Sequence, residues 1–236
     1  MTDLLILAAA VLIAAFVQGA TGFGFALLAG PVIGIVEPAL LPGFLLIQMI
    51  PLNSYILWRE RGGIDRPGIT WVSAGRLLGT FGGLGVLLLV TAHQLQLLIG
   101  LSIILAVITT LLAPSFDPKR VAFVIAGLVT GVTETSTGIG GPPLALVFQH
   151  RPAPTLRSSV AACFVIGEVI SLVILALTGR IGSDQIRSAV LLLPAVAIGA
   201  LLSHLVHHRL TGPLMRYTVL GFALLSGLVV TAQALS

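Results

Sequence analysis

Long apolar stretches separated by short polar connections make up almost the whole chain. The eight apolar segments cover approximately residues 4–36, 39–58, 69–91, 94–114, 121–150, 156–178, 187–206 and 214–235. A helix needs about 20 apolar residues to cross the hydrocarbon core of a bilayer, and these segments are long enough to do so. The pattern therefore predicts an all-α integral membrane protein with several spanning helices.

Glycine-rich polar turns interrupt two of these segments. The first turn covers residues 18–24, and the second covers residues 135–143. An offset of 116 residues pairs Gln18 with Glu134, Thr21 with Thr137, Gly22 with Gly138 and Gly24 with Gly140. Helices that break at matching positions of two halves are typical of secondary transporters, which bind their substrates at such breaks.

The segments fall into two sets of four. The first repeat covers residues 1–114 and the second covers residues 115–236, and the loop between them is rich in proline and charge. The same offset of 116 residues carries Pro38 to Pro154 and Gly83 to Gly199, which favours duplication. We therefore expect one membrane domain made of two repeats, each of which opens with a broken helix.

Composition agrees with this class and excludes others. Hydrophobic residues make up 57% of the chain and charged residues only 8%, which does not describe a water-soluble surface. The net charge of +4 comes from Lys and Arg in the connections, so it indicates membrane orientation rather than nucleic-acid binding. Cys163 is the only cysteine, so no intramolecular disulfide or thiolate metal site can form.

The basic residues also bear on the path of the broken segments. If both segments return to the side they entered from, nine Lys and Arg residues gather on one side and two on the other. If both segments cross, the division is seven against four. The positive-inside rule favours the re-entrant version, which makes the repeats inverted and places both termini outside. A single broken crossing stays open, because 144–149 is a short return arm.

Non-helical backbone at membrane depth is tolerated only where protein or a polar cavity satisfies its polar groups, so we expect the turns to line a cavity. Pro142 and Pro143 suit the first turn of a new helix, whose N–H groups and positive dipole end would attract an anion. The candidate anion-binding residues are Gln18, Thr21, Gly22, Gly24, Arg76, Ser136, Thr137, Gly138, Gly140 and Gly141. The alternative is a proline kink that only shapes the helix. For Arg76, a counter-charge in the cavity and a side chain reaching to the interface are both open.

Two carboxyl groups lie inside apolar segments, where ionisable side chains are costly and usually functional. They are Glu134 and Glu168, and each could bind a proton. Burial of Glu134 away from cations would favour its protonated form. A permanently neutral acid that bonds between helices is the alternative for both. Gln48 and Asn53 are weaker candidates, because such residues more often form hydrogen bonds between helices.

Other polar and small residues have simpler interpretations. The spacing of Gly75, Gly79 and Gly83 predicts close helix packing. His204, His207 and His208 resemble a metal cluster, but they lie beside Arg209 at a helix end, which favours a basic interfacial patch. We therefore expect neither a metal nor a cofactor. No arrangement of catalytic residues can be assembled, so we do not expect an enzyme.

The two glycine turns and the two sets of four segments resemble the TauE/SafE family of sulfite and organosulfur-anion exporters over essentially the whole chain. The residues that carry the resemblance are Gly19-Ala20-Thr21-Gly22-Phe23-Gly24 and Gly138-Ile139-Gly140-Gly141-Pro142-Pro143. The resemblance implies a multi-pass transporter in the bacterial inner membrane that moves a small anion such as sulfite or sulfoacetate, coupled to protons. A passive anion channel and a membrane scaffold are the alternatives. The expected partners are the anion and the lipid bilayer, without nucleic acid, and a homodimer stays open.

Overall fold

The computed structural model describes residues 2–60, 63–112, 117–206 and 213–235. Within these ranges the chain forms ten α-helices and one short 3-10 helix, and no strand. They are α1 (Thr2–Thr21), α2 (Phe25–Val36), η1 (Pro38–Leu40), α3 (Gly43–Arg59), α4 (Arg66–Leu89), α5 (Ala92–Leu112), α6 (Arg120–Thr137), α7 (Gly141–Phe148), α8 (Ala153–Leu177), α9 (Ser183–Val206) and α10 (Pro213–Gln233). The expectations for Arg61, His207, His208 and Arg209 lie outside the described residues.

The all-helical prediction is confirmed, and the expected segments differ from the helices by only a few residues at their ends. Among the described residues, five helices are long and apolar enough to cross a membrane, namely α1, α4, α5, α8 and α9. Large apolar side chains remain exposed along them, such as Leu78, Leu105 and Leu201, each at least 60% exposed. Such a surface suits contact with lipid, so the fold is that of a multi-pass membrane protein.

Both helix breaks occur where the sequence predicts them, and the two turns share their backbone bonds. The N–H of Gly22 donates to the carbonyl of Gln18 at 2.7 Å, and the N–H of Gly138 donates to the carbonyl of Glu134 at 2.8 Å. Gly22 has a φ of 93° and Gly138 a φ of 81°, in the left-handed region that glycine adopts without strain. The backbone of the two turns differs at the next matched pair, Gly24 and Gly140. Gly24 has a φ of 118°, whereas Gly140 has a φ of −142°.

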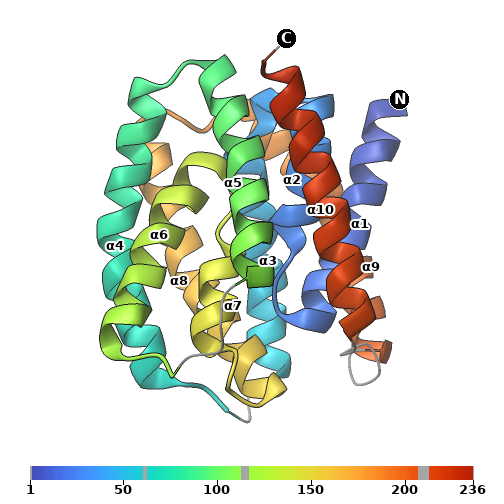
Figure 1. Cartoon of the computed structure of the whole chain (residues 1–236). Coiled ribbons are helices and arrows are strands. Elements are labelled where there is room, and N and C mark those ends of the chain that lie inside the picture. The colour runs from blue at the N-terminus through green and yellow to red at the C-terminus, as the bar shows by residue number, and fades with distance from the viewer. Residues whose placement is uncertain (1, 61–62, 113–116, 207–212, 236) are drawn as a thin grey trace.

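Each broken segment doubles back on itself. Phe148 at the end of α7 packs on Phe123 near the start of α6, with ring centroids 5.3 Å apart. Just beyond α2, the carbonyl of Ala39 accepts a hydrogen bond from Gln185 at the start of α9. Figure 1 shows both chain termini at the same end of the bundle. This chain path is compatible with the re-entrant version, which stays a prediction together with the orientation of the bundle in a membrane.

Glycines allow two pairs of helices to pack at backbone contact. A side chain at Gly79 of α4 would overlap the carbonyl of Leu128 in α6, and Gly75 and Gly83 face that helix in the same way. The predicted packing role of these three glycines is confirmed. In the other half, Gly199 of α9 faces the carbonyl of Leu12 in α1. The pair α4 and α6 forms one flank of the bundle and the pair α1 and α9 the other, and α3 and α8 lie between them and pack on each other (Figure 1).

Candidate functional site

A group of polar side chains is buried in the apolar interior of the bundle. It consists of Gln18, Asn53, Arg76, Glu134 and Glu168, and each is at most 1% exposed. These residues come from five different helices, α1, α3, α4, α6 and α8. We call them the central cluster. Charged side chains at such depth are costly and usually mark a substrate or proton pathway.

One part of the central cluster is a chain of hydrogen bonds between helices. Gln18 donates from Nε2 to Oδ1 of Asn53 at 2.7 Å, and Asn53 donates from Nδ2 to Oε1 of Glu168 at 2.8 Å. The other amide atom of Gln18, Oε1, accepts the N–H of Phe25 at 2.9 Å. Gln18 therefore accepts the hydrogen bond of the first N–H group of α2, on the far side of the first turn. That donor would otherwise be among those open to an anion.

The other part is a buried ion pair beside the second turn. Nη2 of Arg76 lies 2.7 Å from Oε2 of Glu134, and both side chains are fully buried. A side chain at Gly167 would overlap the guanidinium, so Arg76 also packs directly beside the residue that precedes Glu168. One expectation is corrected here, for Glu134, and one of the two open alternatives for Arg76 is excluded. Glu134 is not remote from cations, and Arg76 does not extend to the interface, because α8 holds its head group inside the bundle.

Several polar atoms of this region have no hydrogen-bond partner among the described residues. They are Nε and Nη1 of Arg76, Oε1 of Glu134, Oε2 of Glu168 and both amide atoms of Gln48, a fully buried side chain of α3. Nη2 of Arg76 and Oε2 of Glu134 are in ion-pair contact but are not aligned as a hydrogen bond. Buried polar groups are rarely left unsatisfied, so the atoms of Arg76, Glu134 and Glu168 indicate a place that takes a polar ligand.

The hydroxyl groups beside the turns are used differently from our expectation. Thr21 donates to backbone carbonyls of its own turn, Ser136 donates to the carbonyl of Val132, and Thr137 donates to the carbonyl of Thr133. In this conformation their protons are therefore committed to the backbone. Whether they coordinate an anion in another state stays a prediction, as it does for Gly22, Gly24 and Gly138.

The start of α7 is confirmed, with Pro142 and Pro143 in its first turn. Proline has no N–H, so these two positions offer no donor to an anion. Gly140 has a spatial role, because a side chain there would lie 2.6 Å from Oε2 of Glu134. A side chain at Gly141 would lie 3.5 Å from Cβ of Phe23, so the two turns approach each other. The main effect of the second turn is therefore to bring the backbone close to Glu134, rather than to supply N–H donors.

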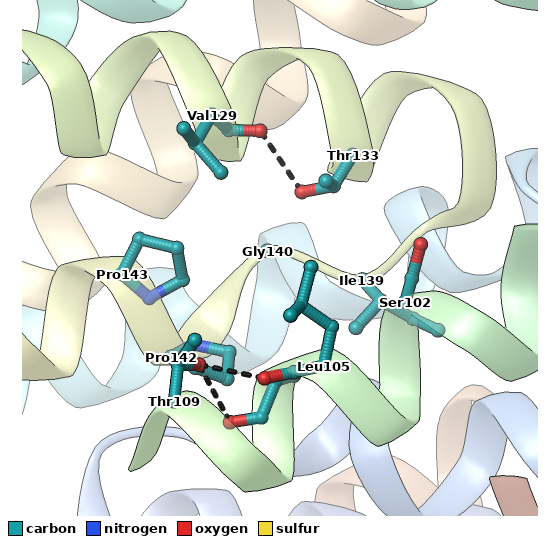
Figure 2. A pocket seen from close by; sticks show the side chains of 10 residues that line it. Ser102, Leu105, Thr109, Val129, Thr133, Ile139, Gly140, Pro142 and Pro143 are labelled. Carbon is teal, nitrogen blue, oxygen red and sulfur yellow. Dashed lines mark hydrogen bonds between the residues drawn. The ribbon is translucent and has the colours of Figure 1, made fainter. Parts of the chain in front are cut away.

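A cavity of about 100 Å³ adjoins the second turn on the side of α5. Figure 2 shows Gly140, Pro142 and Pro143 facing Leu105 and Thr109 across it. Its walls are almost entirely apolar, and the hydroxyl groups of Thr109 and Thr133 donate to carbonyls of their own helices. This cavity does not suit an oxyanion. The polar environment that we expect at the break lies at the central cluster instead.

Asn53 forms the hydrogen bonds between helices that the sequence analysis expects of such residues. Asn53 links the two repeats by bonding both Gln18 and Glu168. The repeat offset of 116 carries Asn53 to Val169 rather than to Glu168, so the repeat does not mark this contact, and nothing in the sequence marks Gln48. Its burial follows from the packing of α3 in the centre of the bundle.

Comparison with known proteins bears on the function of this arrangement. The searches of curated proteins and of solved structures gave no match. The family described as Sulfite exporter TauE/SafE matches residues 7–230, which is nearly the whole chain. The match includes both broken helices and every residue of the central cluster. The chain therefore belongs to the TauE/SafE family of sulfite exporters.

Proposed function

We propose that the protein is a secondary transporter that moves a small sulfur-containing anion of the sulfite type together with a proton. Membership of the TauE/SafE family supports anion transport, and the family's name supports the sulfite class. The observation that carries the proposal is the buried contact between Arg76 and Glu134 at the second helix break. A transporter needs no catalytic group, and we assign none.

Arg76 is the proposed anion ligand. Its planar guanidinium matches an oxyanion better than a point charge does, and Nε and Nη1 keep N–H groups without partners among the described residues. The Phe164 ring lies 5.8 Å from the guanidinium and limits where an anion can approach. The two helix turns, which approach each other between Gly141 and Phe23, complete the proposed surroundings of the anion.

Glu134 is the proposed proton carrier, because it competes with the anion for Arg76. While Glu134 is ionised, its carboxylate holds the guanidinium and repels an incoming anion. A proton on Glu134 removes both effects. If both carboxyl groups were ionised, the central cluster would carry one excess negative charge, and an anion without a proton would add to it at low dielectric. Anion and proton should therefore bind with positive linkage.

The surroundings of Glu168 differ from those of Glu134, and we give Glu168 a secondary role. Its carboxylate accepts a hydrogen bond from Asn53, and no ion pair to Arg76 is found for it among the described residues. We assign Glu168 to setting the charge of the central cluster, and to proton transfer only if Glu134 fails the tests below.

Flux measurements in proteoliposomes test the proposal. Purified protein is reconstituted, the membrane potential is clamped to zero, and radiolabelled sulfite is supplied outside with or without an inward proton gradient. The proposal predicts accumulation above the outside concentration only when the gradient is present, with competition by sulfoacetate but not by a cation. Downhill flux that ignores the gradient would favour a channel. No flux of any small anion would leave the family assignment standing but would refute transport by this chain alone.

A further inference from the structure

A second buried group of charges lies at one end of the bundle, where α3 ends and α8 begins. It consists of Arg59, Glu60 and Arg157, whose side chains are 5%, 9% and 5% exposed. Neither the family match nor the proposed mechanism assigns these residues a role. We call them the end cluster. Other basic residues near helix ends on this side are Arg66, Lys119, Arg120 and Arg151.

Both arginines of the end cluster converge on one carboxylate oxygen. Nε of Arg157 lies 2.9 Å from Oε1 of Glu60, and Nη2 of Arg59 lies 3.3 Å from the same atom. Two guanidinium groups against one carboxylate leave one excess positive charge. The nearby carboxylate of Asp65 does not offset it, because Asp65 pairs with Arg151 at 2.7 Å. Such a pair of guanidinium groups around an oxygen ligand is the chemistry that binds small oxyanions.

The end cluster adjoins the first helix break. Nη2 of Arg59 donates to the carbonyl of Gly19 at 2.5 Å, and Nη1 donates to the hydroxyl of Ser203 at 3.2 Å. A side chain at Gly22 would lie 2.8 Å from Cγ of Arg157. Gly19 follows Gln18 of the central cluster directly, so the two groups of charges are neighbours along α1. An anion that moves between the central cluster and this end therefore meets the end cluster.

Arg59 is not fully used by its partners. Its Nε is buried and has no hydrogen-bond partner among the described residues. A role for Arg59 in capping the last carbonyls of α1 accounts for the hydrogen bond from its Nη2. Such a role does not account for the unpartnered Nε, nor for the contact that Arg59 and Arg157 share on Glu60. A carboxylate supplied by the chain is the simplest occupant for two arginines when no free anion is bound.

We propose that Arg59 and Arg157 form a second binding site for small oxyanions of the sulfite and sulfate class, and that Glu60 occupies this site until an anion displaces its carboxylate. The choice of ligand class rests on the proposed function. In this arrangement Glu60 sets the affinity of the site, because every anion must compete with a tethered carboxylate for the same guanidinium groups.

Equilibrium binding of sulfate, a stable oxyanion, tests this site without requiring transport. Glu60→Gln removes the competing charge and keeps the size of the side chain. We expect sulfate to bind Glu60→Gln at least about tenfold more tightly than wild type at low ionic strength, measured by calorimetry and by thermal shift. Arg157→Gln added to Glu60→Gln should abolish that gain. Glu60→Asp, which shortens the carboxylate arm and keeps its charge, should show a smaller gain and serves if Glu60→Gln does not fold.

Asp65→Asn is the matched control. It breaks the neighbouring ion pair with Arg151, while asparagine keeps the helix cap on Gly68. We expect no gain in sulfate affinity. An equal gain in sulfate affinity in Asp65→Asn would show that any added positive charge on this face has the same effect, and would overturn the site. Unchanged sulfate affinity in both Glu60 variants would also overturn it. Failure of the proposed function looks different, because sulfate would then bind Glu60→Gln more tightly although wild type transports no anion.

Discussion

Replacing Glu134 by glutamine should make anion binding independent of pH. In wild type the anion-bound state holds one proton more than the free state, so affinity should fall as pH rises. One linked proton gives a change of about tenfold per pH unit, or about 1.4 kcal/mol. Glutamine imitates the neutral acid next to Arg76, so the variant should bind sulfite at every pH about as well as wild type does at low pH.

The same substitution has a predictable effect on stability. Removing one partner of a buried ion pair costs about 3–5 kcal/mol, and the remaining amide oxygen of glutamine should hold the loss to the low end of that range. The pair is fully buried at both ends, so screening by solvent does not reduce the effect. Adding Arg76→Gln to Glu134→Gln removes the unpaired charge and should recover most of the stability while abolishing anion binding.

The assay is the affinity for sulfite from about pH 5 to 8, with sulfate, whose charge is constant over this range, measured beside it to separate the titration of sulfite from that of Glu134, and with the melting temperature of the same samples. Glu168→Gln is the matched control, because it neutralises a carboxylate of the same cluster that accepts from Asn53 rather than pairing with Arg76. It should keep the pH dependence. A Glu134→Gln variant whose affinity still falls about tenfold per pH unit would refute the reasoning. Glu168 would then be the next candidate for the proton site.

Three further predictions test the fold around the site. Gly79→Val should separate α4 from α6 and lower the melting temperature, whereas Gly85→Val, where nothing lies within 4 Å of an added Cβ, should leave it nearly unchanged. Gly138→Val should abolish sulfite binding, measured by calorimetry, in a protein that still inserts, because a β-branched residue resists the φ of 81° at this turn. Reporter fusions after Lys119 and Arg151 should both report the cytoplasm, and opposite sides would defeat the re-entrant path.

The helices and their breaks could be predicted from the sequence because each depends on local chemistry. Apolar runs set the helix lengths, and Gly22 and Gly138 mark the turns because each adopts a positive φ. Pro142 and Pro143 could be placed in the first turn of α7 for the same reason, since a missing N–H is tolerated there. The packing of Gly75, Gly79 and Gly83 followed from their spacing alone.

The contacts within the site could not be predicted, because they join residues that are distant in the chain. Arg76 reaches Glu134 only because glycines bring α4 against α6 and because Gly167 leaves room for the guanidinium. Arg157 meets Glu60 across 97 positions of sequence. Our expectation that Glu134 lies away from cations was wrong for this reason. Its sequence neighbours carry no positive charge, whereas its spatial neighbour does.

The most direct test of the account is to measure anion and proton movement together in the same proteoliposomes. An outward sulfite gradient is imposed at equal pH on both sides, with the membrane potential clamped, and a dye reports internal pH while efflux is followed. The account predicts that sulfite carries protons out with it, so the interior becomes alkaline in wild type and does not become alkaline in Glu134→Gln. Sulfite efflux from wild type without any change of internal pH would contradict coupling through Arg76 and Glu134.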